Sequence, residues 1–250
     1  MSVPKKWSWA RLDFYALFLT TALAFLTPNS ARANSYLAGL HKNVGIGVTY
    51  YQYHQSTLGE PVRQFYVTAK GSLTYVPLYS RFEFSASAFG SIYQIKHFPI
   101  SQKTADILGW NGRVGIRTLG SRETPNGFYF TLSAGFYQIQ TTVSGNIYGI
   151  KKLAGPQGVL SVHNKFKKRP ASFSAYIKYA PIGSSITTVL KPSNMLNNRE
   201  IAGGVSFFIS HYMHRPPAYL NIDYSNLNIR IANIPSITAR SISTSISIGF

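Results

Sequence analysis

The chain alternates apolar and polar residues over most of its length, and this period of two is the feature that most constrains its fold. The closing segment shows it most clearly, because one parity holds apolar or Thr side chains and the other holds Ser and Gly: Ile242, Thr244, Ile246, Ile248 and Phe250 against Ser241, Ser243, Ser245, Ser247 and Gly249. Successive side chains of a β-strand point to opposite faces, whereas a helix with a period of 3.6 would scatter these residues around its axis. The pattern predicts an all-β fold.

Ten segments carry this pattern, and we expect strands at 42–54, 62–75, 81–95, 110–119, 128–140, 153–166, 171–180, 200–210, 218–231 and 237–250. Each has roughly the length of a tilted membrane-spanning strand, about 9–11 residues. The sequence therefore predicts an antiparallel transmembrane β-barrel of about ten strands. Eight or twelve strands remain compatible with the pattern. In the ninth segment the apolar parity changes between Tyr224 and Leu227, so we expect a bulge near Ser225–Asn226.

The composition decides which face turns outward. A soluble β-sandwich or lipocalin-like barrel would share the alternation but would need a charged outer face. Here only 13% of the residues are charged and 14% are aromatic, and the polar parity is mostly Ser, Thr, Gly and Tyr. We therefore expect the apolar face to contact lipid, with aromatic residues near the strand ends, and the hydroxyl-rich face to line the lumen.

The first 33 residues have the three zones of a secretory signal peptide. Lys5, Lys6 and Arg11 precede the apolar run 14–26, and the small-residue site Ala31-Arg32-Ala33 follows. The run is shorter than the about 20 residues that a membrane-spanning helix needs. We expect cleavage after Ala33, a barrel domain over 34–250, and export to the bacterial outer membrane.

The charge balance indicates anionic partners. The chain carries 25 basic and 7 acidic residues, a formal charge of +18, and no cysteine. Nucleic acid is disfavoured by export, which leaves outer-membrane lipids and lipopolysaccharide as expected partners. Lys151, Lys152 and the basic turn 165–169 (KFKKR) are candidate contacts to lipid phosphates, although the turn is more simply a solvated connection. The absence of cysteine excludes a disulfide scaffold, and His211 with His214 makes a weak metal motif, so we predict no metal or cofactor.

Five charged residues have lumen parity: Lys70, Glu83, Arg113, Arg117 and Lys178. Because a buried charge needs a partner, we predict a Lys70–Glu83–Arg113 network inside the barrel. It would either stabilise a filled lumen or form a basic constriction that favours anions.

The final strand resembles the closing strand of bacterial outer-membrane proteins, which typically ends in an aromatic residue after alternating apolar positions. The resemblance implies that Ile246, Ile248 and Phe250 form an assembly signal recognised by the barrel-assembly machinery. In size and pattern the chain is similar to small barrels of the OmpA, OmpX and OmpW kind, and no functional residues follow from that similarity.

Three functions stay open at this point. The first is a structural or surface-interaction barrel with a largely filled lumen, and the second is a narrow channel for small anionic solutes. The third is a lipid-modifying hydrolase using Ser161 and His163, which share the lumen face of one strand. The third is disfavoured because no Asp or Glu lies between Glu123 and Glu200 to orient the imidazole. The oligomeric state is not indicated.

Overall fold

The computed structural model describes residues 39–56, 61–77, 80–95, 105–120, 127–143, 153–165, 173–182, 184–185, 188–189, 198–210, 217–230 and 236–249. The chain divides into two units, Met1–Ala38 and Gly39–Phe250, and all described residues belong to the second. The predicted signal peptide and its cleavage site, together with Phe250, lie outside the described residues. Over the described ranges, no helix is long and apolar enough to span a membrane.

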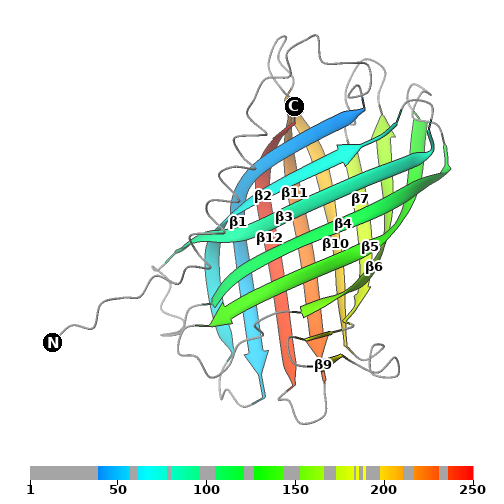
Figure 1. Ribbon diagram of the computed structural model, residues 1–250. Helices are drawn as coiled ribbons and strands as arrows, with labels where there is room; N and C mark the ends of the chain where they lie inside the picture. Colours follow the sequence, from blue (N-terminus) through cyan, green and yellow to red (C-terminus); the bar gives the residue numbers. More distant parts are fainter. Residues whose placement is uncertain are drawn as a thin grey trace. The chain divides into compact units, whose positions relative to one another are not determined.

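Ten long strands form a single antiparallel barrel (Figure 1). They are β1 (Leu40–Gln55), β2 (Val62–Tyr75), β3 (Phe82–Gln94), β4 (Ala105–Leu119), β5 (Gly127–Val143), β6 (Leu153–Lys165), β7 (Phe173–Pro181), β10 (Arg199–Ser210), β11 (Ala218–Ile229) and β12 (Ile237–Gly249). Each pairs with its neighbour along the chain, and β1 pairs with β12, so the sheet closes on itself. The prediction of a ten-strand antiparallel barrel is confirmed.

The barrel has two ends that differ in their connections. At one end, called the C-terminal end here, β1 begins and β12 finishes, since Asn43 pairs with Gly249. At the other, called the loop end, the longest connection spans 182–198 between β7 and β10. Two short strands in this connection, β8 (Ser184–Ser185) and β9 (Thr188–Val189), pair with each other, and β8 also pairs with the start of β6. The predicted loop over 181–199 therefore adds a small hairpin to the barrel wall.

The structure corrects the predicted irregularity in the ninth strand. The pairing of β11 with β12 runs without a register shift through Ser225 and Asn226, so there is no bulge at that point. Leu227 and Ile229 instead turn into the barrel, where they are buried. A register shift does occur where β11 pairs with its other neighbour, β10, and it lies between Phe208 and Ser210 of β10.

Two strands are longer than predicted at the loop end. β4 begins at Ala105 and β5 extends to Val143, so residues 105–109 and 141–143 are strand where the sequence predicted loops. Ile107 lies in the added part of β4 and packs, as Ile139 of β5 does, against a buried cluster inside this end of the barrel. The interior is apolar there, so the lumen positions lose the polar character by which the strands were recognised.

Candidate functional site in the barrel lumen

The outer and inner surfaces have opposite character. Large apolar side chains are exposed on the outer face of every long strand except β2, where the outward Phe65 and Val67 are half-buried; Ile46, Phe82, Leu132, Ile177 and Ile246 are each more than half exposed. The lumen positions between them are polar and buried, such as Thr49, Thr68, Thr131, Ser243 and Ser245. An apolar outside around a polar inside is the arrangement of a transmembrane β-barrel. The chain is a transmembrane β-barrel, as the alternation predicted.

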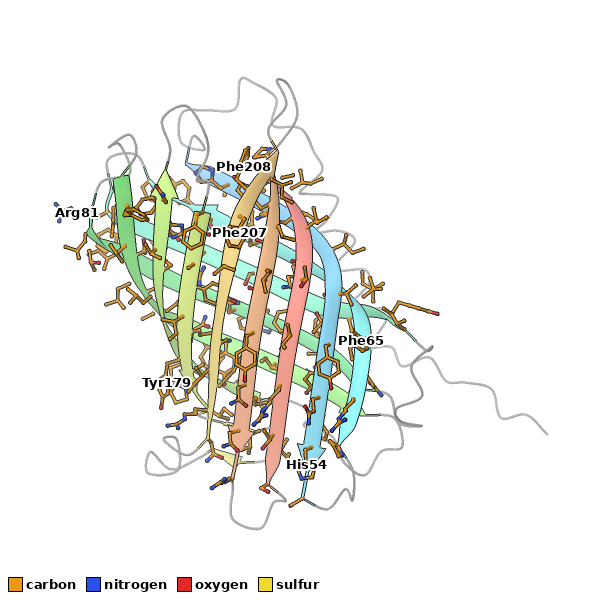
Figure 2. The ribbon with its side chains drawn as sticks, turned by 180° about the vertical axis from the view of Figure 1, so that it is seen from behind. His54, Phe65, Arg81, Tyr179, Phe207 and Phe208 are labelled. Atoms are coloured by element: carbon orange, nitrogen blue, oxygen red, sulfur yellow. The ribbon has the colours of Figure 1, made fainter. Side chains whose placement is uncertain are left out.

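Aromatic residues lie on the outer face toward both ends of the barrel. Phe82, Phe128 and Phe207 lie toward the C-terminal end, and Tyr179 and Tyr224 lie toward the loop end. Figure 2 shows Phe207 and Tyr179 near opposite ends of the wall. These positions fit the aromatic girdles that sit at the two membrane–water interfaces of a barrel.

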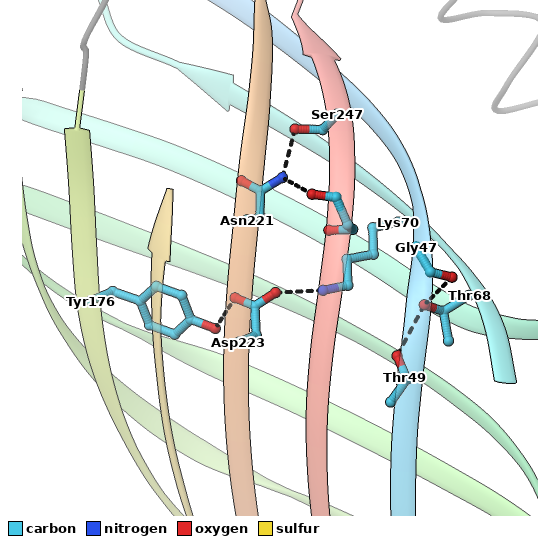
Figure 3. A network of polar contacts seen from close by, with 9 residues as sticks. Gly47, Thr49, Thr68, Lys70, Tyr176, Asn221, Asp223 and Ser247 are labelled. Carbon is cyan, nitrogen blue, oxygen red and sulfur yellow. Dashed lines mark hydrogen bonds and ion pairs between the residues drawn. The ribbon is translucent and has the colours of Figure 1, made fainter. Parts of the chain in front are cut away.

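The centre of the lumen is bridged by an ion pair between strands that are not neighbours. Lys70 on β2 pairs with Asp223 on β11, and the second carboxylate oxygen of Asp223 accepts a hydrogen bond from the Tyr176 hydroxyl on β7 at 3.0 Å (Figure 3). β1 and β12 separate β2 from β11 in the sheet, and β10 separates β11 from β7. These contacts therefore pass through the interior rather than along the wall.

A second ion pair lies beside the first. Lys178 Nζ on β7 is 2.8 Å from Glu200 Oε2 on β10, and Ser225 donates a hydrogen bond to the other Glu200 oxygen at 2.7 Å. The Lys178 ammonium also lies over the ring of Tyr137, 5.1 Å from its centroid. Each ionised group thus has a partner of opposite charge, as burial requires.

The remaining predicted lumen charges are also inside. Arg113 donates a hydrogen bond from Nε to Ser85 Oγ at 2.6 Å, and Glu83 and Tyr176 act electrostatically on its guanidinium. Arg117 lies over the ring of Tyr129, 5.6 Å from the centroid. The predicted pairing of Lys70 with Glu83 is wrong: the carboxylate that pairs with Lys70 comes from across the lumen, because Asp223 faces it there.

The loop end of the lumen is filled by apolar and aromatic side chains. The cluster consists of Tyr51, Tyr53, Tyr66, Tyr137, Leu153, Ala180, Ile182, Leu227, Ile229, Ile237 and Ala239, and each is at most 6% exposed. Ring contacts join Tyr51 to Tyr53 and to Tyr66, each with centroids 6.5 Å apart. This cluster, which the sequence analysis did not identify, lies between the central ion pairs and the long connection at 182–198.

Ser161 and His163 are close together on β6. The distance between Ser161 Oγ and His163 Nε2 is 3.2 Å, and the imidazole stacks on Tyr129 with centroids 4.7 Å apart. The three carboxylates whose side chains are described, Glu83, Glu200 and Asp223, lie on β3, β10 and β11, which are not neighbours of β6 in the sheet. His211 and His214 lie outside the described residues, among which no group of three His, Cys, Asp or Glu could hold a metal ion.

Comparison with solved structures finds other barrels. Neisserial surface protein A is 9% identical with a TM-score of 0.39, and the match covers 85% of this chain and 98% of that chain. Ail, the attachment invasion locus protein of Yersinia pestis, is 8% identical with a TM-score of 0.33, covering 84% and 98%. The Pseudomonas putida toluene transporter TodX is 10% identical with a TM-score of 0.33, covering 85% and 89%. No family model and no curated protein matches the chain.

Proposed function

We propose that this barrel is a non-conducting integral protein of the outer membrane, with a structural or surface-interaction role, whose lumen is closed by its own side chains. The observation that carries the proposal is the lumen-crossing contact of Lys70 and Tyr176 with Asp223. The apolar cluster at the loop end supports it independently, because tightly packed apolar side chains are a poor path for ions.

The ion pairs also bear on the alternative of an anion channel. An anion-selective constriction needs uncompensated positive charge facing the pore. Lys70 and Lys178 each have a carboxylate partner, Asp223 and Glu200, which lowers the positive potential that they would present to a solute. We therefore favour the closed barrel over the narrow channel.

Planar-bilayer recording of the purified, refolded protein tests the proposal. We expect no steady unitary current, and flotation of the same sample with lipid vesicles establishes that the silent protein is inserted. Steady, anion-preferring unitary currents would contradict the closed lumen and favour the channel.

The hydrolase is supported only by the short Ser161–His163 contact. Ser161 and His163 point into the lumen, whereas the neighbouring Leu160 is 46% exposed on the outer face of β6. The two polar side chains therefore face away from the lipid that a lipid hydrolase would have to reach. We expect no lipid hydrolysis by the purified barrel. Hydrolysis that Ser161→Ala abolishes would instead establish the enzyme.

A further inference from the structure

The outer face carries a row of basic and amide side chains near the loop end of four adjacent strands. Gln52 on β1 is in register with Arg63 on β2 and with Arg240 on β12, and Arg240 is in register with Asn226 on β11. Directly opposed residues on one face of a sheet have Cβ atoms about 4.5–5.5 Å apart. The four side chains, called the basic row here, are thus near neighbours, and both arginines are exposed.

The residues that alternate with the basic row show that it faces outward. Gln64, the residue after Arg63, and Tyr51, the residue before Gln52, are buried inside the barrel. Two residues further from the loop end, Ile242 is 51% exposed and Tyr224 is 45% exposed on the outer face. Because side chains of equal parity share a face, the basic row lies on the same lipid-facing surface as these two residues.

An apolar surface continues directly from the basic row toward the middle of the barrel. Tyr50 is in register with Phe65 and with Ile242, and Ile242 is in register with Tyr224. The Tyr50 and Phe65 rings are in contact, with centroids 5.0 Å apart. A ligand that covers both surfaces must be amphiphilic, with an anionic group at the arginines and hydrocarbon against the aromatic and aliphatic side chains.

Among the residues described with side chains, no carboxylate lies on the outer face beside the two arginines of the basic row. All three carboxylates described with side chains have lumen positions, and Asp223 and Glu200 are engaged there by lysines. Arginine is suited to phosphate because its planar guanidinium can donate two parallel hydrogen bonds.

The side of the membrane follows from the connections. The longest connection, 182–198, lies at the same end as the basic row, and longer loops of outer-membrane barrels face the cell exterior. The basic row then lies at the headgroup level of the outer leaflet. We propose that Arg63 and Arg240 bind a phosphate group of a phosphorylated glycolipid, lipopolysaccharide, whose acyl chains lie along Tyr50, Ile242 and Tyr224. This site is separate from the lumen and does not depend on whether the lumen conducts.

Binding of purified lipopolysaccharide to the refolded full chain in detergent micelles tests the site, with lipopolysaccharide stripped of its lipid A phosphates and phosphatidylglycerol as competing probes. We expect the phosphorylated form to bind at least about tenfold more tightly than either competitor, which corresponds to about 1.4 kcal/mol. Equal affinity for the dephosphorylated form would overturn the proposal. Equal affinity for phosphatidylglycerol would also overturn it, because the basic row would then bind any anionic headgroup.

The variant Arg63→Gln/Arg240→Gln should lose this preference, whereas Arg63→Lys/Arg240→Lys should retain part of it through charge alone. The matched control is Lys42→Gln/Arg81→Gln, which removes two positive charges at the C-terminal end; Figure 2 shows Arg81 at the end opposite His54 of β1. Unchanged binding by the first variant, or equal loss in the control, would contradict the proposal. The competition on the unmodified protein decides the matter if the variants do not refold.

Discussion

At the scale of single residues, Asp223 is the group on which the lumen contacts converge. It accepts from Lys70 and from Tyr176, which come from opposite sides of the barrel, and its own side chain is 24% exposed. Loss of one partner of a buried polar contact leaves the other unsatisfied, which costs more than the contact itself contributes. Asp223 should therefore matter more to stability than any single wall hydroxyl.

Asp223→Ala is expected to lower the free energy of unfolding by about 1–3 kcal/mol, because it leaves the Lys70 ammonium and the Tyr176 hydroxyl without their acceptor. Urea titration of the protein refolded into lipid vesicles measures this change. The double-mutant cycle with Lys70→Ala should show coupling, since the two side chains are in contact. Additive effects of the two substitutions would indicate that the ion pair contributes nothing to the fold.

Glu83→Ala is the comparison within the same lumen. Glu83 interacts with Arg113 electrostatically, but Arg113 keeps its hydrogen bond to Ser85 when the carboxylate is removed. We therefore expect a smaller loss of stability than for Asp223→Ala. A larger loss for Glu83→Ala would restore the network that the sequence predicted, with Glu83 at its centre.

The facing of these residues was predictable, and their partners were not. Alternation alone placed Lys70, Arg113 and Lys178 in the lumen. Asp223 has the same signal, since it lies between the outward residues Ile222 and Tyr224. Parity tells which face a residue occupies, but the curvature and tilt of a closed sheet decide which strands meet across it. Pairing Lys70 with the acidic residue of lumen parity on the next strand, Glu83, therefore selected the wrong carboxylate.

At the scale of elements, the seam between β1 and β12 closes the barrel and leaves little room. A Cβ atom on Gly47 would lie 2.2 Å from the carbonyl oxygen of Thr244 and 2.4 Å from Ser245 Cβ. Gly71 on β2 offers a contrast, because a Cβ atom there would meet nothing within 4 Å. The first glycine is required by close approach of the strands, and the second is not.

Gly47→Ala is expected to impair closure, with a loss of about 1–3 kcal/mol typical of overpacking, whereas Gly71→Ala should be tolerated. Electrophoresis of unheated and boiled samples checks this, because a folded barrel should migrate faster before boiling. A normal fast-migrating band for Gly47→Ala at raised urea concentration, or its loss for Gly71→Ala, would argue against this register of the seam.

Most element boundaries were predicted to within two residues, and the exceptions are the loop-end limits of β4 and β5. β2 spans Val62–Tyr75, as expected, but β4 and β5 continue past their predicted loop-end limits. In β11, Leu227 and Ile229 suggested a bulge because apolar residues were expected to face lipid. They face the buried cluster instead. A single sequence does not separate an apolar side chain that meets lipid from one that packs inside.

At the scale of the whole molecule, membrane insertion depends on one arrangement: apolar side chains face hydrocarbon and polar ones face a closed interior. Trp110 on β4 reports on it directly, since it is 45% exposed on the outer face and contacts Phe136 with ring centroids 6.2 Å apart. The chain has three tryptophans, and the other two, Trp7 and Trp9, precede the predicted cleavage site. The difference between the unmodified protein and Trp110→Phe therefore isolates the signal of this residue.

The decisive measurement is quenching of Trp110 fluorescence in vesicles by lipids brominated along their acyl chains, compared with quenching by iodide in the water. We expect strong quenching by the brominated lipids and little by iodide. Fluorescence that the brominated lipids leave unchanged while iodide quenches it would contradict the membrane-spanning barrel with its apolar face turned to lipid.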